Sequence, residues 1–181
     1  TIKAVKQVSV GAQVSGQVKK LHVALGATVK AGQLVAEIDA TPQTNALRNA
    51  EAALQNIQAQ RLAKQANLVQ AELTFKRQQA LLAQDATSKE SFEAAQASLN
   101  VLRADLKAQE AQIEQQRITA DTARVNLGYT RITAPMDGVV VAVVTEEGRT
   151  VNANQSAPTI IKIARLDTVT VKAQISEADV V

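Results

Sequence analysis

Apolar side chains recur with a helical period through the middle of the chain. Between Pro42 and Gly128 there is neither glycine nor proline, the two residues that most strongly interrupt a helix. Within this span a seven-residue step connects largely apolar positions, which is the spacing of a left-handed coiled-coil seam. Before the segment "QDATS" the row is Leu47, Leu54, Arg61, Leu68, Phe75 and Leu82. After it the row is Phe92, Leu99, Leu106, Ile113, Ala120 and Leu127, with companions at Ala95, Leu102, Gln109, Gln116 and Ala123.

The outer ends of these two predicted helices carry boundary residues. Thr41 can cap the first helix by accepting backbone N–H bonds, with Pro42 at the first helical position, where no N–H is needed. Gly128 can adopt the left-handed conformation that ends the second helix. The pattern therefore predicts a helical segment over residues 41–128.

The break near residues 84–88 has the composition of a helix start. Thr87 and Glu90 have the spacing of a capping box, and Ser88 is an alternative cap. A connection this short makes the two helices antiparallel neighbours. With about 40 residues in each helix and about 1.5 Å rise per residue, the hairpin should be about 60 Å long.

The two flanks of the hairpin alternate apolar and polar residues, as half-buried strands do. They are "VSVGAQVSGQVKKLHVALGATVKAGQLVAEID" and "ITAPMDGVVVAVVTEEGRTVNANQSAPTIIKI". The flanks are internal repeats: Gly16 and Gly26 lie ten residues apart, as do Gly138 and Gly148. Two similar strand units on either side of a hairpin predict one small β-domain, assembled from both ends of the chain.

Composition narrows the classes of function. The chain has 181 residues, only 2% aromatic residues and a net charge of +3 with no block of like charge, which argues against nucleic-acid binding. It has no cysteine, and His22 is the only histidine, so neither a metal site nor Ser-His or Cys-His catalysis is expected. No apolar run is long enough to cross a bilayer. We expect the chain to be part of a longer protein.

Three segments and the order of elements resemble a known family. The split β-domain resembles the two halves of a biotinyl/lipoyl-type domain. Together with the inserted hairpin, "VSVGAQVSGQV", "LGYTRITAPMDGVV" and "VKAQISEADV" resemble the periplasmic adaptors, or membrane fusion proteins, of tripartite efflux pumps, most closely the MacA type. The resemblance implies an α+β fold: a long antiparallel coiled-coil hairpin between two halves of a lipoyl-like β-domain, with the start of a further β-domain at both chain ends.

The resemblance also implies domain boundaries, which we state as expectations. Residues 1–7 form a strand of the following β-barrel-type domain and residues 8–40 the first half of the lipoyl-like domain. Residues 41–128 form the hairpin, residues 129–166 the second lipoyl-like half, and residues 167–181 the start of the β-barrel-type domain.

Carriage of a prosthetic group is not expected. In lipoyl-type carrier domains the modified lysine lies in a "DKA"-like turn between the halves. The matching segment here is "EIDAT", in which Ala40 and Thr41 follow Asp39. No acceptor lysine is present, so we expect no cofactor.

The hairpin tip is the first candidate site. By resemblance, Arg77, Leu81 and Ser88 match the spacing of the residues with which the family engages the outer-membrane channel protein. Arg offers a fork of donors to carboxylates or carbonyls, Leu an apolar knob and Ser a small polar contact. The alternative is structural: Leu81 packs the hairpin, Ser88 caps a helix and Arg77 is solvated.

The second candidate is a gate in the conduit. In MacA-type adaptors a glutamine ring in the central channel is thought to act as a one-way gate. The resemblance points to Gln155, in "NANQSAPT", as the matching residue. The alternative is an ordinary turn amide.

The implied function is that of a periplasmic adaptor, anchored to the inner membrane by a segment outside this chain. It implies a homo-hexamer, an inner-membrane ABC transporter of the MacB type and an outer-membrane channel of the TolC type as partners. Two alternatives stay open. One is an adaptor of a proton-driven (RND or MFS) or type I secretion pump, and the other is a coiled-coil interaction protein without a transport role.

Overall fold

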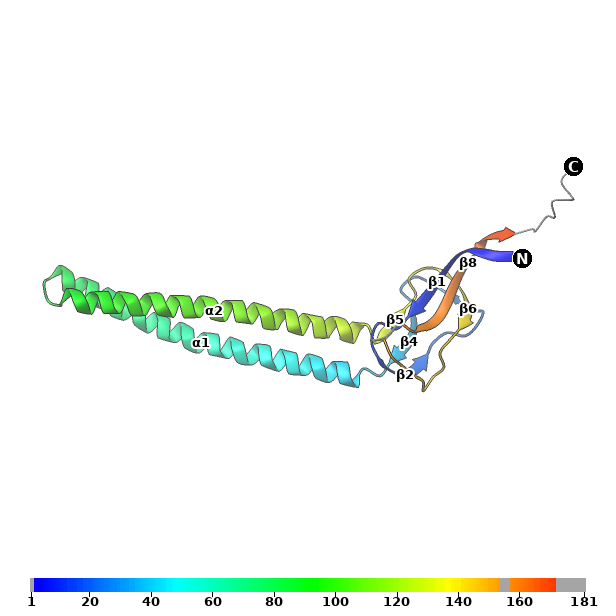
Figure 1. Cartoon of the computed structure of the whole chain (residues 1–181), viewed down its shortest axis with the longest axis horizontal. Helices are drawn as coiled ribbons and strands as arrows, with labels where there is room; N and C mark the ends of the chain where they lie inside the picture. Colours follow the sequence, from blue (N-terminus) through cyan, green and yellow to red (C-terminus); the bar gives the residue numbers. More distant parts are fainter. Residues whose placement is uncertain (1, 154–156, 172–181) are drawn as a thin grey trace, which may run out of the picture. The chain divides into compact units, whose positions relative to one another are not determined.

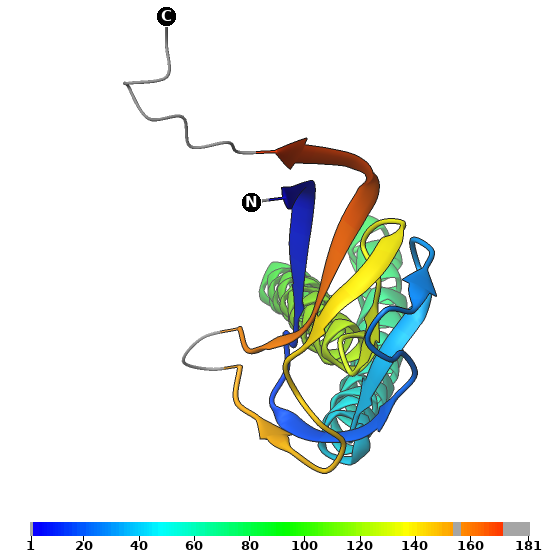
Figure 2. The same cartoon turned by 90° about the vertical axis from the view of Figure 1, so that its right-hand side faces the viewer.

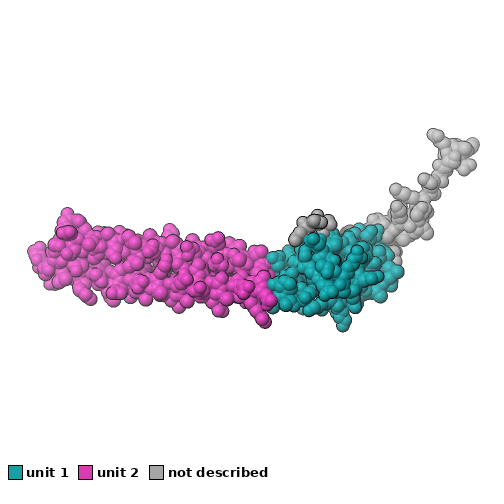
Figure 3. Space-filling model, turned by 60° about the horizontal axis from the view of Figure 1, so that its bottom comes forward, with its two compact units in different colours: residues 1–44, 125–181 teal, residues 45–124 magenta. Residues whose placement is uncertain are grey.

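The computed structural model describes residues 2–153 and 157–171. The chain divides into two compact units, residues 45–124 and residues 1–44 with 125–181 (Figure 3). Unit 45–124 is helical, and the other unit is built mainly from strands drawn from both ends of the chain. The predicted fold class, a helical hairpin flanked by the strands of a split β-domain, is confirmed.

The hairpin consists of α1 (Thr41–Ala83) and α2 (Lys89–Gly128), which run side by side (Figure 1). Its inner seam is the predicted pair of seven-residue rows: Leu68, Leu99, Ile113 and Ala120 are buried, and the other members of both rows are half-buried. The two rings Phe75 and Phe92 pack with centroids 5.4 Å apart. Neither helix, within the described residues, has a stretch apolar enough to cross a membrane.

Polar residues in the inner seam are matched across the two helices. Gln109 is buried, and its Nε2 donates to the backbone oxygen of Ile57 at 3.3 Å. Arg61, which interrupts the first apolar row, places its Nε 3.7 Å from Oε1 of Glu110. A buried polar contact of this kind favours one register of a coiled coil over its neighbours, because slipping would leave the amide unpaired.

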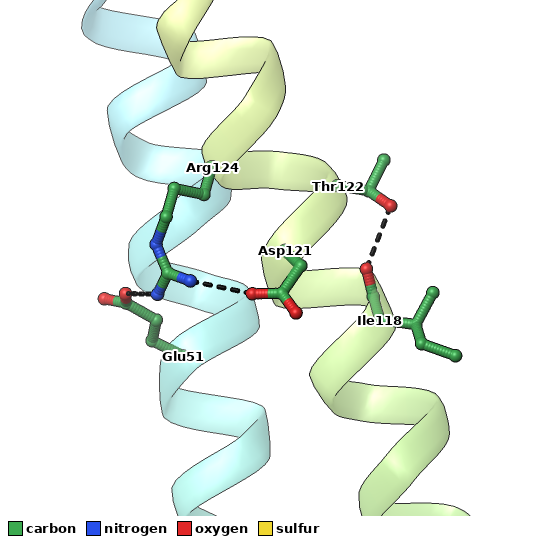
Figure 4. Close-up of polar contacts among 5 residues, drawn as sticks. All are labelled: Glu51, Ile118, Asp121, Thr122 and Arg124. Carbon is green, nitrogen blue, oxygen red and sulfur yellow. Dashed lines mark hydrogen bonds and ion pairs between the residues drawn. The ribbon is translucent and has the colours of Figure 1, made fainter.

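Arg124 joins the two helices near residue 51 (Figure 4). Its guanidinium donates to Glu51 of α1 at 3.1 Å and to Asp121 of α2 at 2.7 Å. The neighbouring residue Thr122 donates its hydroxyl to the backbone oxygen of Ile118, one helical turn earlier in α2. The three charged side chains are exposed or nearly so, which limits the stabilisation that their ion pairs provide.

The side chain of Asp39 caps the start of the first helix, and the predicted capping role of Thr41 is wrong. Oδ1 of Asp39 accepts the Thr41 backbone N–H at 3.1 Å and the Thr41 hydroxyl at 2.8 Å. The backbone oxygen of Ala40 accepts the first helical bond, from Thr44. Thr41 is therefore the first helical residue. The Asp39 carboxylate, two residues before Thr41, satisfies the free Thr41 N–H better than a hydroxyl would.

The second helix also ends differently from the prediction. Gly128 is its last residue, but it does not take the left-handed conformation. Thr130 ends the helix instead, since its backbone N–H and its hydroxyl both donate to the oxygen of Leu127.

Asp39 should make the β-unit sensitive to acid. Lys19, whose Nζ lies 2.9 Å from Oδ1, and the two Thr41 donors lower the pKa of Asp39 from 3.8 to about 2. A carboxyl whose pKa is depressed on folding stabilises the fold above its unfolded pKa, and the effect disappears as the pH falls towards the folded value. We expect Asp39→Asn to be less stable than the parent at pH 7 and the difference to vanish between pH ~4 and ~2.

Urea unfolding of both proteins at several pH values, followed by circular dichroism, measures that difference. A gap between the two proteins that stays constant down to pH ~2 would contradict the assigned ion pair.

The other unit is a sandwich of two four-stranded sheets (Figure 2). The strand order is β1-β8-β6-β3 in one sheet and β5-β4-β2-β7 in the other. The strands before the hairpin are β1 (Ile2–Gly11), β2 (Gly16–Leu21), β3 (Thr28–Val29) and β4 (Leu34–Ile38). Those after it are β5 (Arg131–Thr133), β6 (Gly138–Val143), β7 (Thr150–Val151) and β8 (Thr159–Val171). Both sheets thus combine strands from the two halves.

The sequence repeat is also a structural repeat. Gly16 pairs with Val151 where β2 meets β7, and the equivalent residues Gly138 and Val29 pair where β6 meets β3. The turn glycines have matching φ angles, 82° at Gly26 and 83° at Gly148.

The polar contacts of the turns repeat in the same way. Asp137 accepts the backbone N–H of Ala31 at 2.7 Å, and the equivalent Ser15 accepts that of Ala153 at 2.9 Å. Each half therefore holds the turn of the other, so neither half can complete its sheets alone.

The core between the sheets is made of aliphatic side chains. Ile160, Ile161 and Ile163 of β8 are fully buried, as are Val18 and Val140 at equivalent positions of the two halves. Both β1 and β8 run continuously across the boundaries predicted near residues 7 and 167. Those domain boundaries remain predictions.

Candidate functional site at the hairpin tip and outer face

The turn between the helices is a Schellman motif. Asp85 has a φ of 56°, in the left-handed region, and its N–H donates to the oxygen of Leu82. The N–H of Ala86 donates to the oxygen of Leu81 at 2.9 Å. These two bonds satisfy the last carbonyls of α1, with aspartate in the position usually held by glycine.

Ser88 caps the second helix. Its Oγ accepts the backbone N–H of Ser91 at 3.1 Å, and its carbonyl accepts that of Phe92. The predicted capping box of Thr87 with Glu90 is wrong. The Thr87 hydroxyl instead donates to Oε1 of Gln78 at 2.8 Å, which ties the turn back to α1.

The structure places the predicted tip residues around this turn. Arg77 and Leu81 lie one helical turn apart on α1, and Ser88 follows the turn. Arg77 is exposed, with no carboxylate of the described residues at ion-pair distance, while Leu81 is half-buried. Leu81 and Ser88 therefore have structural roles, whereas Arg77 makes no ion pair or side-chain hydrogen bond with the described residues. Gln155, the predicted gate, lies outside the described residues.

A second apolar row lies on the outside of each helix, and sequence reasoning missed it. It has the alternating three- and four-residue spacing of a coiled-coil seam, and all its members are exposed. We call it the outer seam. On α1 it comprises Ala52, Gln55, Ala59, Leu62, Ala66, Val69, Leu73, Lys76 and Ala80. On α2 it comprises Glu90, Ala94, Ala97, Val101, Ala104, Ala108, Ala111, Gln115 and Ile118.

Large aliphatic side chains are exposed along the outer seam, whereas a helix face that contacts only solvent usually carries polar residues. Leu62 and Val101 keep 65% and 60% of their surface exposed. Contiguous exposed apolar rows of this kind mark contact surfaces. The signal in the sequence was the repeated alanine at this spacing. Alanine is equally common on solvated helix faces, so the row did not stand out.

The polar members of the outer seam lie towards its ends. Lys76 and Glu90 lie near the tip, and neither has an ion-pair partner within residues 2–153 and 157–171. Gln55 and Gln115 lie further from the tip, between alanines. The middle of the seam is wholly apolar on both helices.

His22 of the β-unit, which directly follows β2, places its Nε2 3.4 Å from Oε1 of Glu37 in β4. In the described part of the chain, no three of His, Asp or Glu gather as metal ligands do.

Three comparisons with known proteins agree with a helical hairpin inserted into a split β-domain. A family model described as "RND MFP, barrel-sandwich hybrid domain" matches residues 6–163. The chain is 43% identical over 180 residues to the macrolide export protein MacA of Escherichia coli O157:H7, covering 99% of this chain and 48% of that protein. It is 44% identical over 180 residues to the pyoverdine export membrane fusion protein PvdR of Pseudomonas putida, covering 99% and 46%.

The fold has a close solved counterpart. The crystal structure of MacA from Actinobacillus actinomycetemcomitans superposes with a TM-score of 0.92 at 45% identity, covering 99% of this chain and 55% of that chain. The chain spans about half the length of the curated relatives that it matches.

Proposed function

Because the chain belongs to the RND membrane fusion protein family, through its barrel-sandwich hybrid domain, we propose that it is the periplasmic adaptor of a tripartite ABC-type export pump. Several copies form a conduit between an inner-membrane ABC transporter of the MacB type and an outer-membrane channel of the TolC type. Relatives named for macrolide and for pyoverdine export support this role. The role is mechanical, and the chain contributes neither catalysis nor a cofactor.

The outer seam carries this proposal, because it lets hairpins pack side by side. Within one hairpin Phe75 faces Phe92 and Arg61 faces Glu110, which fixes the levels of α1 and α2. In a second copy standing at the same height, α2 presents small residues opposite Leu62 and Leu73 of α1, while Val69 lies level with Val101. Leu73 lies level with Ala94 and Ala97 of that copy, and Leu62 lies level with Ala108.

The polar members of the seam match at the same levels. Lys76 of one copy meets Glu90 of the next near the tip, and Gln55 meets Gln115 further along. Opposite charges and paired amides at fixed heights set the register of a coiled-coil contact. Repeating this α1-to-α2 contact around an axis closes a ring, for which the family resemblance supplies the number of six copies.

We assign the two ends of the conduit from the family resemblance. The tip residues Arg77, Leu81 and Ser88 dock on the outer-membrane channel in the periplasm. A segment beyond this chain anchors the adaptor to the inner membrane. Gln155 contributes to a gate in the channel. Relatives of nearly equal similarity are named for two unrelated cargoes, so the proposal assigns cargo choice to the transporter.

A second candidate is the adaptor of a proton-driven RND pump. The description of the matching family model, which names RND membrane fusion proteins, favours it. Identities of 43% and 44% to MacA and PvdR favour the ABC-type reading. Co-purification with tagged transporters of each class separates the two candidates.

A charge-swap experiment tests the assembly. Lys76→Glu and Glu90→Lys should each weaken self-association by about tenfold or more, because each places like charges opposite each other in the seam. The double variant restores the opposite pairing, so it should recover assembly. Analytical ultracentrifugation of the full-length protein measures the association.

Lys107→Glu is the matched control, since Lys107 is exposed on α2, lacks an ion-pair partner among the described residues and lies outside the outer seam. It should assemble like the parent. Single charge reversals that assemble normally, or a double variant that stays dissociated, would refute the seam contact.

A further inference from the structure

A cleft of about 560 Å³ opens on the β-unit, away from the features used above. Two runs of consecutive residues line it: Val8 to Gly11 from β1, and Arg131 to Thr133, the whole of β5. Val125 and Gly128 at the end of α2 and Pro135 complete the apolar part of the lining. Gln13 and Tyr129 add polar groups to the lining. Lining by consecutive residues means that the walls are strand edges, with backbone as well as side chains facing the cleft.

The two strands in the lining are sheet edges, with no further strand beside them among the described residues. β1 is the end strand of one sheet, and β5 is the end strand of the other. Each pairs with a strand on one side only within the described residues, β1 with β8 and β5 with β4. Every second residue of an edge strand directs its N–H and C=O to the open side. The cleft is therefore faced by backbone donors and acceptors from two directions.

The volume suits a short extended chain. With strands about 4.8 Å apart, sheets about 10 Å apart and a rise of about 3.4 Å, a strand residue occupies roughly 160 Å³. A cleft of about 560 Å³ then holds between three and four residues. This matches the four residues of β1 and the three of β5 that line it.

The side chains that line the cleft define which residue types an added strand would carry. On the inner face lie buried Val10 and Ile132, which fit aliphatic neighbours. On the outer face Arg131 is exposed and is the only charged residue lining the cleft, with no carboxylate of the described residues at ion-pair distance. An added strand therefore alternates aliphatic and polar residues, with a carboxylate opposite the guanidinium.

We propose that this cleft binds an extended acidic segment of a partner protein, whose backbone pairs with β1 and β5 at once and whose carboxylate meets Arg131. Such a segment joins the two sheets along their open side. The proposal does not depend on the outer seam or on the hairpin tip. It gives the β-unit a contact of its own, in the form of strand addition.

Titration with short peptides tests the proposal. The probe is the capped peptide Thr-Val-Glu-Val, added to the full-length protein and followed by amide resonances. Shifts should concentrate on Val8 to Gly11 and Arg131 to Thr133. Arg131→Glu should weaken binding about tenfold and should favour the peptide in which lysine replaces glutamate. Arg149→Glu, an exposed cation outside the cleft, should leave binding unchanged.

Backbone methylation separates strand addition from an ordinary pocket. A strand held between two edges uses alternate amides on opposite sides, so methylating either set should abolish binding. Methylated peptides that bind as well as the parent, unchanged binding to Arg131→Glu, or no binding at millimolar peptide would each overturn the proposal. The Lys76→Glu variant should bind the peptide normally, which keeps this test independent of assembly.

Discussion

Replacing Gly138 with alanine is expected to destabilise the β-unit by about 2–3 kcal/mol, the upper part of the range for overpacking. A Cβ atom at this position would lie 2.7 Å from the backbone oxygen of Ala164 and 2.7 Å from Cγ2 of Ile163. The oxygen belongs to β8, which is paired on both sides, by β1 and β6. The backbone there cannot retreat without losing sheet hydrogen bonds, so the clash has no inexpensive relief.

Gly16 is the matched position in the other half of the repeat, and it should tolerate alanine better. Its added Cβ would meet only the Cγ2 of Ile38, at 2.6 Å, apart from a more distant backbone oxygen at 3.6 Å. A side-chain methyl can move by a change of rotamer, at a cost of about 1 kcal/mol. The repeat therefore provides two equivalent glycines. The loss of stability on substitution by alanine depends on whether the atom next to the added Cβ belongs to the backbone or to a side chain.

Native-state hydrogen exchange measures these effects in the β-unit without interference from the helices, at the β6 and β8 amides for Gly138 and at the β2 and β4 amides for Gly16. Gly128→Ala is the third member of the set. Nothing lies within 4 Å of its added Cβ, and the residue is helical, so alanine should stabilise α2 by up to about 1 kcal/mol. Equal effects at Gly138 and Gly16 would contradict the packing account.

The sequence alone was sufficient for the hairpin because its signal is local. A seven-residue row needs no knowledge of distant residues, and even Arg61 fits once Glu110 lies opposite it. The capping residues were harder to predict. Thr87 and Ser88 are equivalent by spacing, and the choice falls to Ser88 because Gln78, nine residues earlier, holds the Thr87 hydroxyl.

In the β-unit, local sequence patterns predicted the repeated halves but not which strands pair. Gly16 and Gly26 are repeated later in the chain as Gly138 and Gly148. This repeat predicted two similar units, and the structure contains them. The repeat did not reveal that β3 leaves its own half to pair with β6 while β7 pairs with β2. That exchange depends on contacts between residues more than one hundred positions apart, which periodicity does not encode.

The two seams of the hairpin differ in what buries them. The inner seam uses bulky residues such as Leu68, Leu99 and Ile113, and α1 and α2 cover it within one chain. The outer seam sets a few large residues among many alanines, which no other part of unit 45–124 covers. An alanine-rich face allows close approach of a second helix pair. The same hairpin can thus be stable by itself and still present a surface for neighbours.

Arg77→Asp is expected to abolish export while leaving the hairpin folded and able to assemble. Arg77 is exposed, makes no ion pair among the described residues and lies outside the outer seam, so its loss removes nothing that holds the chain together. A guanidinium offers five donors in a fixed fork, and reversing its charge turns attraction for a carboxylate or carbonyl into repulsion. Truncating or reversing such an anchor residue commonly costs several kcal/mol of binding, a loss of 100-fold or more.

The measurement combines cargo export in cells carrying the transporter and channel with cross-linking of the adaptor tip to the channel. Lys107→Asp supplies the same charge change in the middle of α2 and should leave both readouts intact. Arg77→Lys should be intermediate, since lysine keeps the charge and loses the fork. Normal export by Arg77→Asp, with cross-linking unchanged, would mean that Arg77 is only a solvated residue. Docking would then rest on Leu81 and Ser88, whose side chains also pack the hairpin and cap α2.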